Sequence, residues 1–290
     1  LFVRLLFKTI SYFAPKICSH IPFIPTIMKI SLLALATIVG TAAAGLPELS
    51  LQVRDGSFAD LDGLDPTLKW SVSTSTGDLN LEAGIEASVR PTTDIASLPR
   101  AFWGKASQDI GAWGVSAQAD VSASDLKSAD IEISAENSVD DLSVKLLASA
   151  GDGFSVSSVE ATKKFASGDA TISVNPRYDV SSGSGDVVLG YDAGETSIEV
   201  TASADEQSVT VSRQVDDSNR ISPTLALQSK DFSVEWERSL DDGNSVTTTV
   251  TPNQAIDIEW NDAAWTANVN LPIDDGIGGA NVSIKRELNF

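Results

Sequence analysis

Apolar and polar residues take turns along the final stretch of the chain, residues 280–290. Val282, Ile284, Leu288 and Phe290 share one parity, and Ser283, Lys285, Glu287 and Asn289 share the other. Successive side chains of a β-strand point to opposite faces, so this stretch is predicted to be a strand with one apolar and one polar face.

The same pattern recurs upstream at a fixed interval. When Val211, Trp236, Trp260 and Ile284 are aligned, the steps between them are 25, 24 and 24 residues. A step of that length holds two strands and two turns, so the repeating unit is predicted to be a β-hairpin.

Strand-like segments separated by Asp, Gly, Asn and Ser turns fill residues 67–290, and the cleanest runs from Leu79 to Val89. About sixteen strands are expected, with no amphipathic helix of useful length. Residues 91–111 contain Pro91, Pro99 and Trp103 and are predicted to form an irregular insertion. Residues 45–66 are assigned to an N-terminal segment, and residues 67–290 to a single all-β domain.

The opening of the chain has the character of a targeting segment. Residues 28–44 combine a basic start at Lys29, an apolar run and an Ala42-x-Ala44 cleavage pattern, as a secretory signal peptide does. Residues 1–27 are interpreted as upstream sequence, with an extended targeting leader as the alternative. The leader is therefore expected to span residues 1–44.

Removing that leader restricts the available chemistry. Cys18, His20 and Met28 are the only residues of their types, so residues 45–290 contain no thiol and no imidazole. Zinc sites of Cys and His and Ser-His or Cys-His catalysis are thereby excluded, and no metal or cofactor is expected. Of the 20 basic residues, Arg4, Lys8, Lys16 and Lys29 are lost, which leaves 16 against 40 acids and a net charge of −24. Nucleic acid is not expected as a partner, because the negative charges repel each other.

An antiparallel meander of this size must close, pack as two layers or assemble edge to edge. The last strand, which alternates up to a terminal Phe290, resembles the closing strand of porin-like outer-membrane β-barrels. The resemblance implies a closed barrel of about 14–16 strands, seated in an outer membrane or in a plastid-type organelle envelope. It also implies membrane lipid and the barrel-assembly machinery as partners, and it allows a homo-oligomer. An open or two-layer antiparallel sheet is the alternative fold.

Two sets of residues follow from the barrel prediction. Charged residues on the polar parity are expected to line the lumen: Lys69, Glu82, Glu86, Arg90, Arg177, Glu235, Glu237, Asp257, Glu259 and Lys285. Aromatic and arginine residues on the apolar parity are expected to lie at the membrane rim: Trp70, Trp113, Arg213, Trp236, Arg238, Trp260, Trp265, Arg286 and Phe290.

The favoured function is passive permeation of small polar solutes or cations, without enzymatic activity. The alternative is a soluble secreted or organelle-lumenal sheet that assembles edge to edge into a coat or shell. A third interpretation is a carbohydrate-binding or carbohydrate-cleaving sandwich that uses exposed Trp residues and acid pairs such as Glu82 and Glu86.

Overall fold

The computed structural model describes residues 43–44, 48–53, 64–89, 93–94, 97–262, 265–274 and 279–289. Within them, nineteen strands belong to one sheet. In the first half these are β1 (Ala43–Ala44), β2 (Glu48–Val53), β3 (Leu64–Thr76), β4 (Leu79–Ser88), β5 (Pro99–Ile110), β6 (Trp113–Ser122), β7 (Ala129–Asn137), β8 (Leu142–Ala150), β9 (Phe154–Ser167) and β10 (Ala170–Asp179). The second half has β11 (Ser184–Asp192), β12 (Thr196–Ser203), β13 (Gln207–Gln214), β14 (Asn219–Ala226), β15 (Phe232–Ser239), β16 (Ser245–Thr251), β17 (Ala255–Asp262), β18 (Trp265–Pro272) and β19 (Asn281–Asn289).

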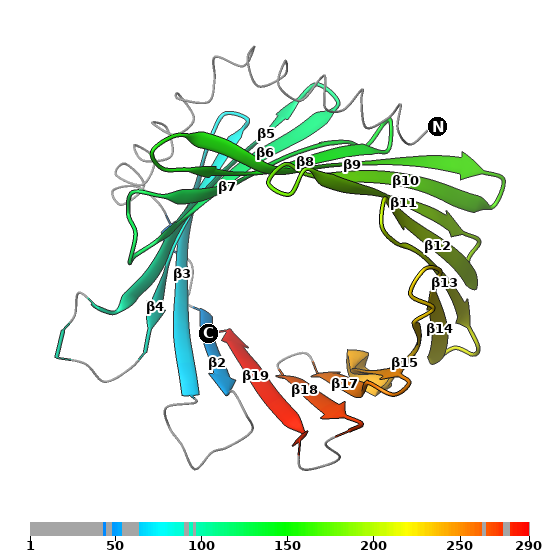
Figure 1. Ribbon diagram of the computed structural model, residues 1–290. Helices are drawn as coiled ribbons and strands as arrows, with labels where there is room; N and C mark the ends of the chain where they lie inside the picture. The colour runs from blue at the N-terminus through cyan, green and yellow to red at the C-terminus, as the bar shows by residue number, and fades with distance from the viewer. Residues whose placement is uncertain are drawn as a thin grey trace.

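The sheet is an antiparallel meander whose pairings return to their starting point. Each strand from β2 to β18 pairs with the next strand in the sequence, and β19 pairs with β2 through Ile284↔Val53 to Asn289↔Glu48. Figure 1 shows this ring, with β19 lying beside β2. With the two-residue β1 set aside, eighteen of the nineteen described strands make up the ring. The predicted fold class, an all-β up-and-down barrel, is confirmed, and the strand count exceeds the expected 14–16.

The hairpin repeat predicted from the 24–25-residue step is confirmed. Val211, Trp236, Trp260 and Ile284 lie on β13, β15, β17 and β19, so each step crosses one hairpin. The connecting turns use residues that tolerate positive φ. Gly77 at φ 60° and Gly168 at φ 63° each close a two-residue turn, where a side chain would be strained.

Two sequence assignments differ from the structure. Residues 91–111, predicted to be an irregular insertion, contain the twelve-residue strand β5. Its outward positions include Gly104 and Ala106. These small residues make the alternation of apolar and polar side chains weaker than in the other strands, so the pattern did not predict a strand here. Residues 45–66, placed outside the β-domain, contribute β2 and the start of β3 to the ring. Ala43–Ala44, assigned to the leader, pairs with Val72 and Ser73 of β3.

The described residues form no large hydrophobic core. The buried apolar residues are small: Ala83, Ala148, Ala150, Ala170 and Val187. Many large apolar side chains are instead exposed, including Trp70 at 46%, Phe165 at 48% and Leu189 at 44%. A soluble sandwich would bury such residues between its two layers. In this sheet they remain exposed and form an apolar face, which is unfavourable in contact with water.

Candidate functional site

One parity of side chains forms a continuous polar face around the ring. Glu82 of β4 stands opposite Lys105 of β5, and the row continues through Gln118 of β6 and Glu132 of β7. The backbone register keeps the same parity across the seam, where residue 48 of β2 pairs with both residue 289 of β19 and residue 69 of β3. A slip of one residue anywhere would have moved charged residues to the apolar face.

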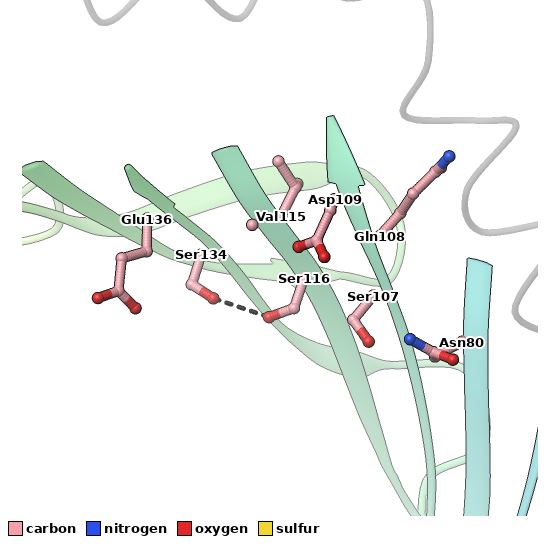
Figure 2. Close-up of a pocket in the computed structure, with 9 residues that line it drawn as sticks. Asn80, Ser107, Gln108, Asp109, Val115, Ser116, Ser134 and Glu136 are labelled. Carbon is pink, nitrogen blue, oxygen red and sulfur yellow. Dashed lines mark hydrogen bonds between the residues drawn. The ribbon is translucent and has the colours of Figure 1, made fainter. Parts of the chain in front are cut away.

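The grooves of the sheet are lined mainly by residues of the polar parity, so we take this face as the concave one and call it the inner wall. A groove of about 600 Å³ is hollowed into it over β15 to β18, lined by Glu235, Glu237, Thr247, Thr249, Asp257, Glu259, Asn268 and Asn270 among others. A second groove of about 260 Å³ lies over β4 to β7. Figure 2 shows Ser116 and Ser134 in this second groove, where their hydroxyl oxygens are 2.7 Å apart.

Carboxylates dominate the inner wall. Among strand residues with described side chains, sixteen inward positions are acidic: Glu82, Glu86, Asp109, Asp120, Asp130, Glu132, Glu136, Glu160, Asp179, Asp186, Asp192, Glu199, Glu235, Glu237, Asp257 and Glu259. Seven are basic: Lys69, Lys105, Lys145, Lys164, Arg177, Arg220 and Lys285. In the same set, Asp262 is the one acid on the outer parity. The inner wall therefore carries a strong excess of negative charge.

The residues predicted to line the lumen fall on this wall wherever the structure describes them. Lys69, Glu82, Glu86, Arg177, Glu235, Glu237, Asp257, Glu259 and Lys285 all occupy inward register positions. Arg90 lies outside the described residues. The structure gathers Glu235, Glu237, Asp257 and Glu259 in the larger groove, with the Ser and Thr side chains of β16 between them.

Hydrogen bonds hold several inner-wall charges in place. Arg177 donates from Nε and Nη2 to the two carboxylate oxygens of Asp186, at 2.6 and 2.9 Å. Lys145 Nζ lies 2.8 Å from Glu132 Oε2. The side-chain amide of Asn175 donates to Glu160 Oε1 and to Thr162 Oγ1, both at 2.7 Å. Fixed charges and dipoles of this kind set the electrostatic field along the inner wall.

Trp103 is a prominent inner-wall residue that was not predicted to lie there. It lies on β5, the strand assigned to the insertion, and its indole rests against Gly84 of β4. The alternation is present in β5, with Trp103, Lys105, Ser107 and Asp109 on the polar parity. It is weak because Phe102 and Ile110 share the apolar parity with Gly104, Ala106 and Gln108.

The outer face carries aromatic and arginine residues at one end of the ring. Odd-numbered strands from β3 to β17 all end at the same rim, called here the first rim, because neighbouring strands are antiparallel. Arg238 lies near the end of β15, Arg213 near the end of β13, and Trp260 near the end of β17. Trp236 is the fifth of the eight residues of β15, and its indole Nε1 donates to Asn219 Oδ1 at the start of β14. Trp113 and Trp265 begin β6 and β18 at the same rim. These six residues were predicted to lie at a rim.

Of the other three residues predicted to lie at the rim, one lies in the middle of its strand, and the side chains of the other two are outside the described part of the chain. Trp70 is the seventh of the thirteen residues of β3, so it lies near the middle of its strand and not at a rim. The backbone of Arg286 belongs to β19, but its side chain is outside the described part of the chain. Phe290 lies outside the described residues.

Acidic turn residues cap neighbouring backbone amides at both rims. Glu206 accepts hydrogen bonds from the amides of Gln228, Ser229 and Gln207, at 2.9, 3.2 and 3.2 Å, and these bonds lower the pKa of its carboxyl. Bonds from the Ser218 amide and the Asn219 side chain likewise lower the pKa of Asp216. Glu206 thus ties the turn between β12 and β13 to the turn between β14 and β15.

The described residues contain no helix with the length and apolar character needed to cross a membrane. They also contain no group of three or more His, Cys, Asp or Glu residues arranged to hold a metal ion.

Comparison with known proteins gives matches only at the level of structure. No protein-family model matches the chain, and no curated protein matches it. Solved structures similar to it include a mutant of Rh. blastica porin, with 9% identity and a TM-score of 0.43 over 86% of this chain and 100% of that one. OccK10 from Pseudomonas aeruginosa gives 10% identity and a TM-score of 0.39, covering 86% of this chain and 99% of that chain.

The outer membrane protein opdK from P. aeruginosa gives 11% identity and a TM-score of 0.34, with coverage of 86% and 99%. The matches thus include porins, the family that the closing strand resembles. The closed ring is given by the strand register.

Proposed function

We propose that this chain is a membrane β-barrel that allows passive permeation of small polar solutes, with a preference for cations. One observation carries the proposal: a ring of strands places exposed large apolar side chains on its outer face and sixteen carboxylates against seven bases on its inner wall. The apolar outer face is compatible with contact to lipid, and the charged inner wall is compatible with contact to water.

The charge excess supports the preference for cations. Carboxylates along a water-filled path attract cations and repel anions, as rings of Asp and Glu do in cation channels. The larger groove adds a local concentration, because its lining contains Glu235, Glu237, Asp257 and Glu259 and no basic side chain. Arg220 stands next to it, opposite Glu237, and offsets part of that charge.

The membrane proposed is an outer membrane or an organelle envelope of the plastid type, reached through the secretory leader. The aromatic and arginine residues of the first rim support a membrane setting. Trp at an interface places its ring at headgroup depth, and Arg extends its charge toward water while its stem stays in the apolar layer. Lipid, the barrel-assembly machinery and further copies of the chain are the partners proposed with it.

Edge-to-edge assembly into a coat finds less support. That function requires a free sheet edge, whereas each described strand from β2 to β19 has a partner on both sides. The exposed apolar face is also difficult to reconcile with a soluble chain.

Reconstitution in planar bilayers tests the proposal. Under a KCl gradient, the protein is expected to conduct with a reversal potential of the sign that K⁺ selectivity gives. Carbonate-washed membranes are expected to retain the chain. Absence of conductance from correctly folded protein, or a reversal potential of the opposite sign, would contradict the proposal.

A variant without the four carboxylates of the larger groove tests whether this groove lines the conducting path. Replacing Glu235 and Glu237 by Gln, Asp257 by Asn and Glu259 by Gln is expected to move the reversal potential toward zero. Asp262→Asn is the matched control, because Asp262 lies on the outer parity of the same strand as Asp257 and Glu259. Equal shifts in the two proteins would show that the groove does not line the path.

A further inference from the structure

Trp103 is set apart from the other tryptophans of the chain. Of the six tryptophans, Trp70, Trp113, Trp236, Trp260 and Trp265 lie on the apolar parity of their strands. Trp103 lies on the polar parity, between Gly84 of β4 and Asp120 of β6. Lipid contact therefore explains five of these residues but not the sixth.

The indole of Trp103 lies against the backbone of β4 at Gly84. A Cβ atom placed on Gly84 would lie 2.5 Å from Cε2 and Nε1 of the ring and 2.6 Å from Cζ2. Such distances are possible only because residue 84 has no side chain. The indole therefore lies against the backbone of Gly84, on the polar parity of the sheet and only partly buried.

Carboxylates surround this aromatic surface. Glu82 and Glu86 are two residues before and after Gly84, so they stand on either side of the ring on the same face of β4. Asp120 is directly opposite Trp103 on β6, and the Gln118 side-chain amide donates to its carboxylate at 3.0 and 3.3 Å. Asp130 follows Asp120 in the same row.

Two lysines share this face, and Lys105 is two residues from Trp103 on β5. Lys105 is opposite Glu82 and Lys69 is opposite Glu86. The four carboxylates Glu82, Glu86, Asp120 and Asp130 exceed these two lysines, so the surroundings of the indole are negative on balance.

We propose that Trp103, seated on Gly84 and flanked by Glu82, Glu86 and Asp120, is a binding site for organic cations in the barrel interior. This proposal rests on the proposed channel function and names its solute class. A quaternary ammonium or guanidinium group is attracted to the face of an indole, and nearby carboxylates add Coulombic attraction. A small inorganic cation gains little from an aromatic face, since its hydration shell is costly to remove.

Titration with tetramethylammonium chloride tests the site. Isothermal titration calorimetry on the detergent-folded full chain gives the dissociation constant, and the bi-ionic reversal potential against K⁺ gives the relative permeability. Trp103→Leu is expected to weaken tetramethylammonium binding about fivefold, whereas Trp103→Phe retains an aromatic face and loses less. Trp70→Leu, on the outer face, is the matched control and is expected to change nothing.

The possible results separate the two proposals. If Trp103→Leu binds tetramethylammonium as tightly as the original protein, the site assignment is overturned, whether or not the barrel conducts. If maltose binding depends on Trp103 while tetramethylammonium binding does not, the cation assignment is overturned in favour of a neutral sugar. Binding that depends on Trp103 in a barrel that does not conduct supports the site and contradicts the channel. Heat-dependent migration on detergent gels verifies that each variant is folded.

Discussion

The guanidinium of Arg177 on β10 and the carboxylate of Asp186 on β11 meet in register and share two hydrogen bonds, of 2.6 and 2.9 Å. This two-point contact fixes a positive charge among carboxylates, since Glu160 stands opposite Arg177 on β9. The pair is partly exposed, with 44% and 28% of the two side chains accessible. Its role is therefore expected to concern the field of the lumen more than stability.

Opposite selectivity changes are expected from the two halves of this pair. Arg177→Gln removes a positive charge and is expected to increase the preference for K⁺ over Cl⁻. Asp186→Asn leaves the arginine without its neutralising partner and is expected to reduce that preference. Reversal potentials under a KCl gradient measure both. Shifts of the same sign would show that the pair does not face the conducting path.

Gly84 is expected to resist replacement because of the indole seated on it. Gly84→Val places atoms within 2.5 Å of the ring and is expected to cost about 1–3 kcal/mol in the free energy of unfolding. Valine otherwise favours a strand, so a destabilising result is informative. Gly104→Ala is the control, because the nearest atom to a Cβ at that position is 3.9 Å away. Urea unfolding in detergent compares them, and equal stabilities would contradict the seating of Trp103.

The contact between two turns through Glu206 is expected to depend on pH. The folded pKa of Glu206 lies below its ordinary value of 4.5, because the charged carboxylate accepts backbone hydrogen bonds. The stabilisation is therefore complete above pH 4.5 and is lost as the pH falls through the lowered folded pKa. Hydrogen exchange at the amides of Gln228 and Ser229 should accelerate over that range. Glu206→Gln should exchange faster at neutral pH and respond less to acid; an unchanged profile would exclude this contact as the cause.

Strand length is expected to set the preferred bilayer thickness. The strands β12 to β18 have seven or eight residues, against nine to fourteen for β3 to β9. Eight residues at about 3.4 Å each, tilted by about 45°, cover roughly 19 Å, less than the apolar band of roughly 25 Å in outer-membrane barrels. Folding yields are therefore expected to be higher in bilayers of twelve-carbon lipids than in bilayers of eighteen-carbon lipids.

A pair of neighbouring threonines on β16 gives a matched test of which face of the sheet meets lipid. Thr248 lies on the outer parity, opposite Trp236 and Ile258, and Thr249 lies on the inner wall, opposite Glu235 and Asp257. Thr248→Leu enlarges the apolar surface that lipid meets and is expected to raise the folding yield. Thr249→Leu is expected to lower it or leave it unchanged. A greater gain from Thr249→Leu would reverse the assignment of inside and outside.

Local pattern was sufficient for much of this protein. Strict alternation in Leu79–Val89 and the 24-residue step from Trp236 to Trp260 predicted strands and hairpins, because a strand's side chains switch faces at every residue whatever its partner is. The polar parity likewise predicted that Glu82, Glu235 and Asp257 would share one face. It did not predict β5, since Gly104 and Ala106 occupy apolar positions without a strong apolar signal.

The closure of the ring and the seating of Trp103 were decided only by tertiary structure. Pairing of β19 with β2 joins residues more than two hundred positions apart, and no periodicity within either strand specifies that register. Residues 103 and 84 come together because β4 and β5 pair in one particular alignment. The sequence by itself determined which face each side chain takes, and the long-range pairing determined which faces enclose a common space.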